Sequence, residues 1–226
     1  MSTYEKIETV LILAAGRGMR MMPLTNIVPK AMAPYANSTI IHAGITEIQK
    51  YIKNIYITVG YKGPILAEHV IQYDVSGVIN TNGHGNSWWI FNTIMKYLDN
   101  PILVLTCDNI TKLNFNEIED NYNNLGNPPC MLIPVKPVEG LEGDYIETNN
   151  GIVKRISREI KSDIYCSGMQ VINPKKINHI CRESENFYDV WNHLIKNREL
   201  KNSTVYSEKW ISIDTLEQLE EYENRH

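Results

Sequence analysis

Residues suited to binding phosphate gather near the start of the chain. Positions 13–30 read LAAGRGMRMMPLTNIVPK, with Gly16 and Gly18 close to the basic residues Arg17, Arg20 and Lys30. Glycine lets a backbone turn approach an anion closely, so the amides of such a turn can converge on phosphate oxygens. Lysine is a compact charge for a phosphate oxygen, and arginine is a fork suited to several oxygens at once. The stretch therefore predicts a polyphosphate-binding loop that carries its own cations.

Two familiar glycine patterns are excluded at this loop. A Walker-type loop needs Lys-Ser or Lys-Thr after its second glycine, but Gly18 is followed by Met19 and Arg20. A dinucleotide fingerprint needs a third glycine or an alanine at position 21, which is Met21. A plain strand-to-helix turn with solvated arginines remains the alternative to a phosphate site.

A carboxylate follows the apolar segment 102–106, which reads ILVLT and predicts a buried strand. Ligands of open α/β sheets bind at the carboxyl ends of the strands, and Asp108 lies at such an end. Triphosphate chemistry usually needs a divalent cation held through one or two carboxylates. Asp108 is therefore a candidate ligand of Mg²⁺ and of the nucleotide, with a plain turn aspartate as the alternative.

Strands and helices alternate through the first half of the sequence. Since parallel strands need crossover connections, this order predicts a mostly parallel, Rossmann-like α/β sheet with helices on both faces. The expected strands are residues 10–13, 54–59, 75–80 and 102–106, and the expected helices are residues 40–52, 63–72 and 86–98.

The second half is less regular and predicts a small β-hairpin insertion. A strand is expected at residues 131–135, and Asn149-Asn150-Gly151 is a turn signal between two extended runs. Helices are expected at residues 178–181 and 188–196, and a strand ending near Asp214 precedes a last helix. Without a linker or a repeat, one domain over residues 1–226 is the simplest organisation.

Composition limits the possible partners and the compartment. The 226 residues include 22 Lys and Arg and 26 Asp and Glu, a net charge of -4, which does not favour a nucleic-acid partner. The apolar run 10–15 is too short for a membrane span or a signal peptide. A reducing, cytoplasmic location is expected because the four cysteines are widely spaced, at Cys107, Cys130, Cys166 and Cys181.

The string LAAGRGMRMMPLTNIVPKAM resembles the signature of the nucleoside-diphosphate-sugar pyrophosphorylase (nucleotidyltransferase) family, Leu-Ala-Ala-Gly-x-Gly-x-Arg-(Met/Leu)-x-Pro-Leu-Thr…Pro-Lys. The resemblance implies a GT-A-like nucleotide-binding fold. It also implies attack of a phosphate monoester on the α-phosphorus of a nucleoside triphosphate, with release of pyrophosphate. By this resemblance Arg20 and Lys30 are catalytic, and the nucleotide-binding residues of the loop are Leu13, Ala14, Ala15, Gly16 and Gly18.

The stretch KWISIDTLEQLEEY resembles the late Trp-x-Asp-Ile-Asp-Thr tract of the family, which brings a second carboxylate to the metal. The first aspartate of that tract is replaced here by Ser212, so the resemblance assigns the Mg²⁺ ligand role to Asp214, together with Asp108. An N-cap of the following helix is the alternative role for Asp214.

The segment TNGHGNSWW matches the part of the family that reads the nucleobase. Its GNSWW portion resembles the cytidylyltransferases that act on small molecules such as phosphocholine. The candidate base-binding residues are Asn82, Gly83, Gly85, Asn86 and Ser87. Trp88 and Trp89 are either part of this site or ordinary core aromatics.

The acceptor segment departs from the sugar-phosphate pattern, because Ser157-Arg158-Glu159-Ile160 replaces the usual Glu-Lys-Pro tract. The chain resembles the cytidylyltransferases of capsular phosphoramidate biosynthesis, which implies CTP and L-glutamine phosphate as substrates. The candidate acceptor-binding residues are Lys136, Asp144, Tyr145 and Arg158. Three alternatives stay open: phosphocholine as acceptor, a sugar-1-phosphate uridylyl- or thymidylyltransferase, and a nucleotide-binding regulatory module.

Overall fold

The computed structural model describes residues 4–138, 143–207 and 209–223. These residues fall into two compact units, each assembled from separate stretches of chain. The glycine-loop unit holds Thr9–His84, Leu105–Thr111 and the stretch from Trp210 onward. The hairpin unit holds the stretch before Thr9, together with Gly85–Val104 and Lys112–Lys209.

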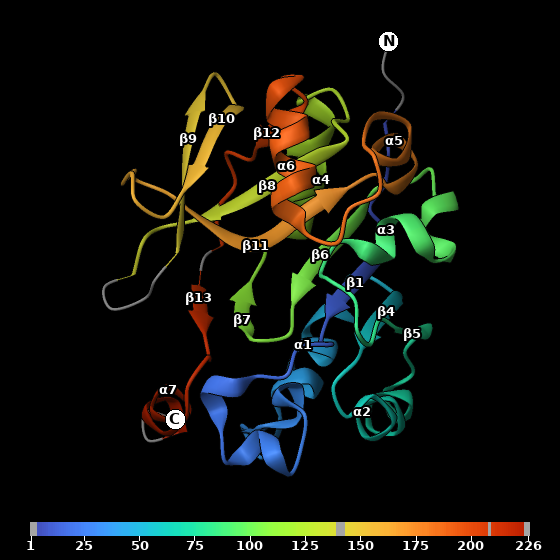
Figure 1. Cartoon of the computed structure of the whole chain (residues 1–226), viewed down its shortest axis with the longest axis vertical. Coiled ribbons are helices and arrows are strands. Elements are labelled where there is room, and N and C mark those ends of the chain that lie inside the picture. The colour runs from blue at the N-terminus through green and yellow to red at the C-terminus, as the bar shows by residue number, and fades with distance from the viewer. Residues whose placement is uncertain (1–3, 139–142, 208, 224–226) are drawn as a thin grey trace. The chain divides into compact units, whose positions relative to one another are not determined.

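The glycine-loop unit is built on three parallel strands that lie side by side in Figure 1: β5 (Gly77–Asn80), β4 (Asn54–Val59) and β1 (Thr9–Leu13). The middle of β1 is fully buried and apolar, as its run of Val, Leu and Ile predicts. Two helices supply the crossover connections that parallel strands require, α1 (Ile40–Ile48) and α2 (Gly63–Val70).

Short elements complete the glycine-loop unit. They are the hairpin of β2 (Pro34–Tyr35) and β3 (Ser38–Thr39), the pair of β7 (Asn109–Lys112) and β13 (Lys209–Ser212), and the C-terminal helix α7 (Leu216–Glu223).

The hairpin unit contains a mixed sheet with the strand order β6-β11-β8-β12-β10-β9. Its strands are β6 (Ile102–Thr106), whose last two residues belong to the glycine-loop unit, β8 (Cys130–Val135), β9 (Asp144–Asn149), β10 (Ile152–Ser157), β11 (Tyr165–Ile172) and β12 (Leu200–Asn202). Its helices are α3 (Trp88–Asn92), α4 (Phe115–Asn124), α5 (Pro174–Ile180) and α6 (Phe187–Lys196). β12 is parallel to β8, whereas β11 is antiparallel to β6, β8 and β9. The α/β class is confirmed, and this second sheet region combines parallel and antiparallel pairings.

The predicted hairpin is confirmed. β9 and β10 pair in antiparallel register from Tyr145 opposite Ser157 to Asn149 opposite Ile152. The turn between them places Asn150 at φ 50° and Gly151 at φ 73°. Two consecutive positive φ angles match the twist of a tight hairpin, and Asn-Gly is the pair that adopts them most easily.

The prediction of one helix over residues 86–98 is wrong. α3 ends at Asn92, and Thr93 is extended, with φ -118° and ψ 177°. The Thr93 hydroxyl donates to the carbonyl of Trp89 (2.7 Å) and accepts the amide of Met95 (3.2 Å). One side chain thus closes α3 and caps the short 3₁₀ helix that follows, a local alternative that threonine offers to a continuing helix.

The largest other differences from the expected helix boundaries are in α1 and α5. α1 ends at Ile48 instead of residue 52, and α5 begins at Pro174 instead of residue 178. Asn173 caps α5 by accepting the amide of Lys176. Proline is tolerated at the first helical position because the amide that it lacks would have no partner within the helix. Among the described residues, no helix is both long and apolar enough to cross a membrane.

Candidate active site

The glycine loop begins on a rigid support. The amide of Ala14 donates to the Thr58 hydroxyl (3.0 Å), and the Ala15 carbonyl accepts the amide of Tyr61 (3.0 Å). A Cβ on Gly60 would come within 2.7 Å of the Ala15 oxygen, so the residue that follows β4 is in close contact with the loop. The Ala14 amide is therefore hydrogen-bonded within the protein. These contacts fix the backbone from which the later amides of the loop follow.

The two glycines of the loop differ in their surroundings. Gly18 has φ +63°, and a Cβ there would lie 2.7 Å from Cβ of Lys30 and 3.2 Å from Thr25. The Thr25 hydroxyl also donates to the Gly18 carbonyl (3.1 Å). A Cβ on Gly16 would meet no described atom within 4 Å. Gly18 is thus required by the fold around Lys30, whereas Gly16 leaves open space above the loop.

Lys30 connects two carboxylates. It opens the short helix Lys30–Met32, and its Nζ donates to Oδ2 of Asp108 (2.8 Å) and to Oδ1 of Asp214 (2.6 Å). Burial alone would lower the pKa of this amine, since only 11% of the side chain is exposed, but the charge of Asp108 and the hydrogen bonds to both carboxylates raise its pKa above the usual value. The ammonium therefore stays charged.

Asp108 lies beside the end of β1. The amide of Cys107 donates to the Leu13 carbonyl (3.1 Å), which places the residue after β6 next to the start of the glycine loop. The carbonyl of Asp108 accepts the amide of Ile213 (3.0 Å), and this bond brings in the strand that carries Asp214. The position is the strand end at which α/β sheets bind ligands.

Asp214 is held by three side chains. Its Oδ1 accepts Lys30 and Nη2 of Arg20 (2.9 Å), and its Oδ2 accepts the Ser212 hydroxyl (3.1 Å). Burial alone would raise the pKa of this carboxyl, but the hydrogen bond and charge of Lys30, with Arg20, lower its pKa below the usual value. Asp214 is therefore a carboxylate oriented toward the cations of the loop.

The alternative role of Asp214 as a helix N-cap is wrong. The Thr215 hydroxyl accepts the amide of Gln218 (3.3 Å), and Oε1 of Gln218 accepts the amides of Asp214 (2.7 Å) and Thr215 (3.2 Å). This is a capping box with Thr215 as the N-cap of α7. The Asp214 carboxylate is consequently left for the site.

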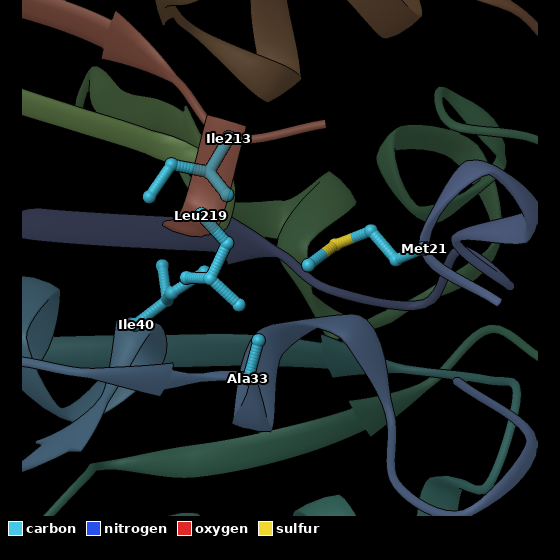
Figure 2. Close-up of a cluster of buried hydrophobic side chains, with 5 residues drawn as sticks. All are labelled: Met21, Ala33, Ile40, Ile213 and Leu219. Atoms are coloured by element: carbon cyan, nitrogen blue, oxygen red, sulfur yellow. The ribbon is translucent and has the colours of Figure 1, made fainter. Parts of the chain in front are cut away.

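A small apolar cluster fixes these distant segments against one another. Figure 2 shows its five buried residues, Met21, Ala33, Ile40, Ile213 and Leu219. Met21 follows the glycine loop, Ile213 immediately precedes Asp214, and Leu219 belongs to α7. Burying this cluster is what brings Asp214 to Lys30 across 184 residues of sequence.

A cavity of about 370 Å³ opens at this point, entirely within the glycine-loop unit. It is lined by Leu13, Gly16, Gly18, Met19, Arg20, Lys30, Thr106, Cys107, Asp108 and Asp214. Seven of these were candidates from sequence. Met19, Thr106 and Cys107 were missed because Met19 stands at a variable position of the loop motif and the other two lie outside it. Among the described residues, Ala14 and Ala15 do not line the cavity.

The donor set of the cavity fits a magnesium ion. One oxygen of Asp108 and one of Asp214 reach the same ammonium nitrogen, so both carboxylates face a single cation position. Mg²⁺ in nucleotide enzymes is typically held by one or two carboxylates, with phosphates and water completing the shell. No group of three or more His, Cys, Asp and Glu able to hold a metal occurs in the described part of the chain, so phosphate oxygens and water would supply the remaining ligands.

The candidate base-binding residues lie in both units. In the hairpin unit, the Gly85 amide donates to Oε2 of Glu185 (2.6 Å), and Oδ1 of Asn86 accepts the amide of Phe187 (3.0 Å). The Ser87 hydroxyl is buried and donates to the carbonyl of residue 184 (2.9 Å). These polar groups bind the segment before α6 and the first residue of α6, a contact that the sequence did not suggest.

In the glycine-loop unit, the remaining base candidates follow β5. Asn82 is exposed, and its amide donates to Oδ1 of Asn80 (2.9 Å). Gly83 is also exposed, with φ +83°. Trp89 is 1% exposed, as expected of the core alternative for that residue.

The acceptor candidates belong to the hairpin unit, where Asp144 and Arg158 form an ion pair and Tyr145 follows Asp144 in β9. Nε of Arg158 donates to Oδ1 of Asp144 (3.0 Å), and the Tyr145 hydroxyl accepts that of Tyr165 (3.1 Å). Burial and a hydrogen bond to Asp144 raise the pKa of Tyr188 to about 12. Tyr165 and Tyr188 were missed because β11 and α6 bring them from outside the hairpin sequence.

The fourth acceptor candidate, Lys136, follows β8 and contacts Tyr206. Its Nζ is 5.1 Å from the ring centre of Tyr206, at a distance typical of a cation–π contact.

Comparison with known proteins places the chain in a family. Residues 9–225 match the nucleotidyl transferase family. The chain belongs to this family.

Curated relatives match parts of the chain. The bifunctional protein GlmU of Methanococcus aeolicus is 30% identical over 130 residues, 51% of this chain and 31% of that protein. The CTP:phosphoglutamine cytidylyltransferase of Campylobacter jejuni is 39% identical over 66 residues, 29% of this chain and 26% of that protein. The chain thus spans about a third or less of the length of these two relatives.

Solved structures match nearly the whole chain at low identity. A Bacillus anthracis protein assigned as a glucose-1-phosphate thymidylyltransferase has a TM-score of 0.79 at 16% identity, covering 96% of this chain and 94% of that one. The inositol-1-phosphate CTP transferase of T. maritima has a TM-score of 0.77 at 15% identity, covering 98% and 96%. The CTP:phosphocholine cytidylyltransferase of Streptococcus pneumoniae has a TM-score of 0.71 at 20% identity, covering 97% and 100%. These matches support the fold of the family.

Proposed function

We propose that this protein is a magnesium-dependent cytidylyltransferase. It transfers CMP from CTP to a small phosphorylated metabolite and releases pyrophosphate, and the acceptor we favour is L-glutamine phosphate, for modification of a capsule or other surface polysaccharide. The observation that carries the proposal is the convergence of Lys30 and Arg20 with Asp108 and Asp214 in one cavity beside the glycine loop.

The proposed reaction needs positioned charge and little covalent chemistry from the protein. A phosphate oxygen of the acceptor forms a bond to the α-phosphorus of CTP. The bond from that phosphorus to the bridging oxygen of the β-phosphate breaks, and pyrophosphate leaves with the electron pair. No general base is required, because the acceptor phosphate already carries its nucleophilic oxygen.

Each polar residue of the cavity has a role in this reaction. The open backbone at Gly16 admits the triphosphate, and Arg20 and Lys30 neutralise charge on the phosphates where it accumulates. Asp108 and Asp214 would hold Mg²⁺, which would supply positive charge to stabilise the negative charge of the phosphates.

The choice of CTP rests on two kinds of support. The GNSWW segment resembles small-molecule cytidylyltransferases, and relatives whose names state CTP as the donor are found in sequence and in structure. The acceptor rests on the Campylobacter match and on the cluster of Asp144 with Arg158. A carboxylate beside a guanidinium suits a substrate that carries both an ammonium and a carboxylate.

A second candidate is uridylyl or thymidylyl transfer to a sugar 1-phosphate. The match to the Bacillus anthracis protein favours it. Phosphocholine as acceptor is a third candidate, for which Tyr145, Tyr165 and Tyr188 supply aromatic rings near a carboxylate. Binding of a triphosphate without any turnover would instead indicate a regulatory module.

The test is a matrix of triphosphates against acceptors. The purified protein is incubated with Mg²⁺ and CTP, UTP, dTTP, ATP or GTP, each with glutamine phosphate, phosphocholine or a hexose 1-phosphate. Pyrophosphate release is measured, and the product is identified by phosphorus NMR. The proposal predicts a new pyrophosphate linkage with CTP and glutamine phosphate. Product only from UTP or dTTP with a hexose phosphate would reject it.

A further inference from the structure

Three ion pairs link the four charged groups of the cavity in a chain. Lys30 bonds to both carboxylates, and Arg20 bonds to Asp214, so two cations meet two anions and the formal charge of the group is zero. Oδ1 of Asp214 accepts both cations. The oxygens that face the cation position are therefore already paired within the protein.

This pairing opposes the binding of either ligand alone. A free divalent cation needs the oxygens that Lys30 holds, and the displaced ammonium would lose both partners in a partly buried site. A triphosphate without metal would bring its negative charge next to Asp108 and Asp214. The positive charges of Lys30 and Arg20, which would attract it, are already neutralised by these two carboxylates. When both ligands bind together, the metal takes the place of Lys30 and Arg20 at the carboxylates. The phosphates then provide new partners for the two side chains, so each ligand favours the binding of the other.

Lys30 is the better placed of the two cations for this exchange. It bonds to both carboxylates and is 11% exposed, whereas Arg20 bonds to one carboxylate and is 69% exposed, where water and salt weaken the pair. The stem of Lys30 is packed against Gly18 through Cβ and Cδ, and its nitrogen lies in the cavity that Gly16 lines. An exchange of partners would therefore take place by rotation about the last bonds of the side chain.

We propose that Lys30 is an exchangeable counter-ion that couples the binding of metal and triphosphate. The inference rests on the function proposed above and adds the binding behaviour of the site. In the empty site Lys30 occupies the cation position between Asp108 and Asp214, and it moves to the phosphates when metal and triphosphate arrive together. Because coupling between two ligands is reciprocal, the same factor strengthens the metal in the presence of triphosphate and the triphosphate in the presence of metal.

The decisive variant is Lys30→Met, and the decisive readout is the affinity for Mn²⁺ alone, measured by the electron paramagnetic resonance signal of free Mn²⁺. A lysine that acted only on phosphates would not affect this affinity. The exchange predicts that Lys30→Met binds Mn²⁺ alone about tenfold or more tightly than the wild type. It also predicts that CTP raises Mn²⁺ affinity by a smaller factor in the variant than in the wild type.

Two controls separate this effect from general electrostatics. Lys62→Met removes one positive charge from the same unit, where Lys62 lies 5.5 Å from the ring centre of Tyr61, and should leave the affinity for Mn²⁺ alone within twofold of wild type. Lys30→Arg keeps the charge and should keep Mn²⁺ binding weak. Equal Mn²⁺ affinities in Lys30→Met and the wild type would overturn the exchange.

A wild-type measurement makes the test independent of how the variant folds. The ¹⁵Nζ resonance of Lys30 is followed by NMR during addition of Mg²⁺ alone, CTP alone and both. The exchange predicts that the full change in the chemical shift of this resonance requires both ligands. A full change in chemical shift with Mg²⁺ alone would contradict the exchange. Failure of the wild type to bind CTP with Mg²⁺ would reject the proposed function instead, so the two claims fail on different observations.

Discussion

At the scale of single residues, the two glycines of the loop serve different purposes. Gly18 combines a left-handed φ of +63° with close packing on the stem of Lys30, so its missing side chain is a requirement of the fold. Gly16 borders open space in the cavity, so its missing side chain leaves room for a ligand. The same residue type therefore contributes to stability at one position and, in our proposal, to binding at the other.

Alanine substitution should separate these two roles. Gly18→Ala should lower the free energy of unfolding by at least about 1 kcal/mol, because a non-glycine residue is strained at positive φ and its Cβ would strike Lys30. Gly16→Ala should change that free energy by less than about 0.5 kcal/mol and should weaken CTP binding several-fold. Urea unfolding and calorimetry measure the two quantities. Equal effects of both substitutions on stability would contradict the distinction.

Ser212 stands where the related tract has an aspartate, and its hydroxyl donates to Oδ2 of Asp214. We expect Ser212→Ala to leave the fold intact and to reduce the rate of pyrophosphate release about fivefold, since one orienting hydrogen bond to a carboxylate contributes roughly 1 kcal/mol. Ser212→Thr keeps the hydroxyl and should retain most of the rate. A Ser212→Ala enzyme with wild-type rate would show that the bond does not orient Asp214.

At the scale of elements, the C-terminal helix α7 supports a site whose other residues come from the first part of the chain. Its N-terminal capping box sets the chain direction just after Asp214, and Leu219 joins the apolar cluster of Figure 2. The position of Asp214 therefore depends on helix packing as much as on its own hydrogen bonds.

Truncation of Leu219 should affect both stability and binding. Leu219→Ala should lower the free energy of unfolding by about 2–5 kcal/mol, the usual range for a buried leucine. It should also weaken CTP binding in Mg²⁺ at temperatures where the variant remains folded. Glu220→Ala, an exposed position of the same helix, is the matched control. Unchanged CTP affinity in a destabilised Leu219→Ala protein would argue that α7 does not position Asp214.

Two histidines, one in α1 and one in α2, contact Tyr73 of the 3₁₀ helix Ile71–Tyr73 that follows α2. His42 of α1 stacks on Tyr73 at 3.9 Å, and His69 of α2 meets the edge of the same ring at 5.2 Å. His69 also shares a hydrogen bond with Thr39 (3.0 Å). Burial, and then the nearby His42, lower the pKa of His69 below its usual value near 6.5.

This shift predicts a loss of stability in mild acid. As the pH falls through about 6.5, the unfolded chain takes up a proton at His69 that the folded protein does not, so the free energy of unfolding decreases. His69→Gln should lose less stability than wild type between pH 7.5 and pH 5.5, as measured by urea unfolding. His179→Gln, at an exposed position of α5, is the control. Identical pH dependence of His69→Gln and wild type would reject this role.

At the scale of the whole molecule, local sequence predicts the parts of the site that are themselves local. Gly16, Gly18, Arg20 and Lys30 lie within one short stretch, and Asp108 follows a plainly apolar strand. The β9–β10 hairpin was predicted because its Asn-Gly turn has a strong backbone preference.

Elements that depend on distant partners were not predicted. The sequence of β11 contains the small or polar residues Ser167, Gly168 and Gln170, so it lacks the apolar pattern of a strand. The Ser167 hydroxyl bonds to the carbonyl of Ile133, and Gln170 bonds to Trp191, and only the folded protein provides these partners. α4 is rich in Asn and Asp, which are weak helix formers. Burial of its own Ile118 and Tyr122 compensates for this low helix propensity.

The hydrogen bonds of Gly85, Asn86 and Ser87 to residues at the start of α6 and just before it were also not predicted. The partners are separated by 97 to 101 residues of sequence. The division into two compact units likewise reflects contacts among stretches that are far apart in sequence. The prediction of one domain over residues 1–226 stays a prediction.

The most direct test of the central claim is the equilibrium binding of CTP to the wild-type protein in ample Mg²⁺, measured by calorimetry beside Asp108→Asn. We predict saturable binding at one site, weakened about tenfold or more when Asp108 loses its charge. Absence of measurable affinity for CTP and for every other common nucleoside triphosphate would contradict the account.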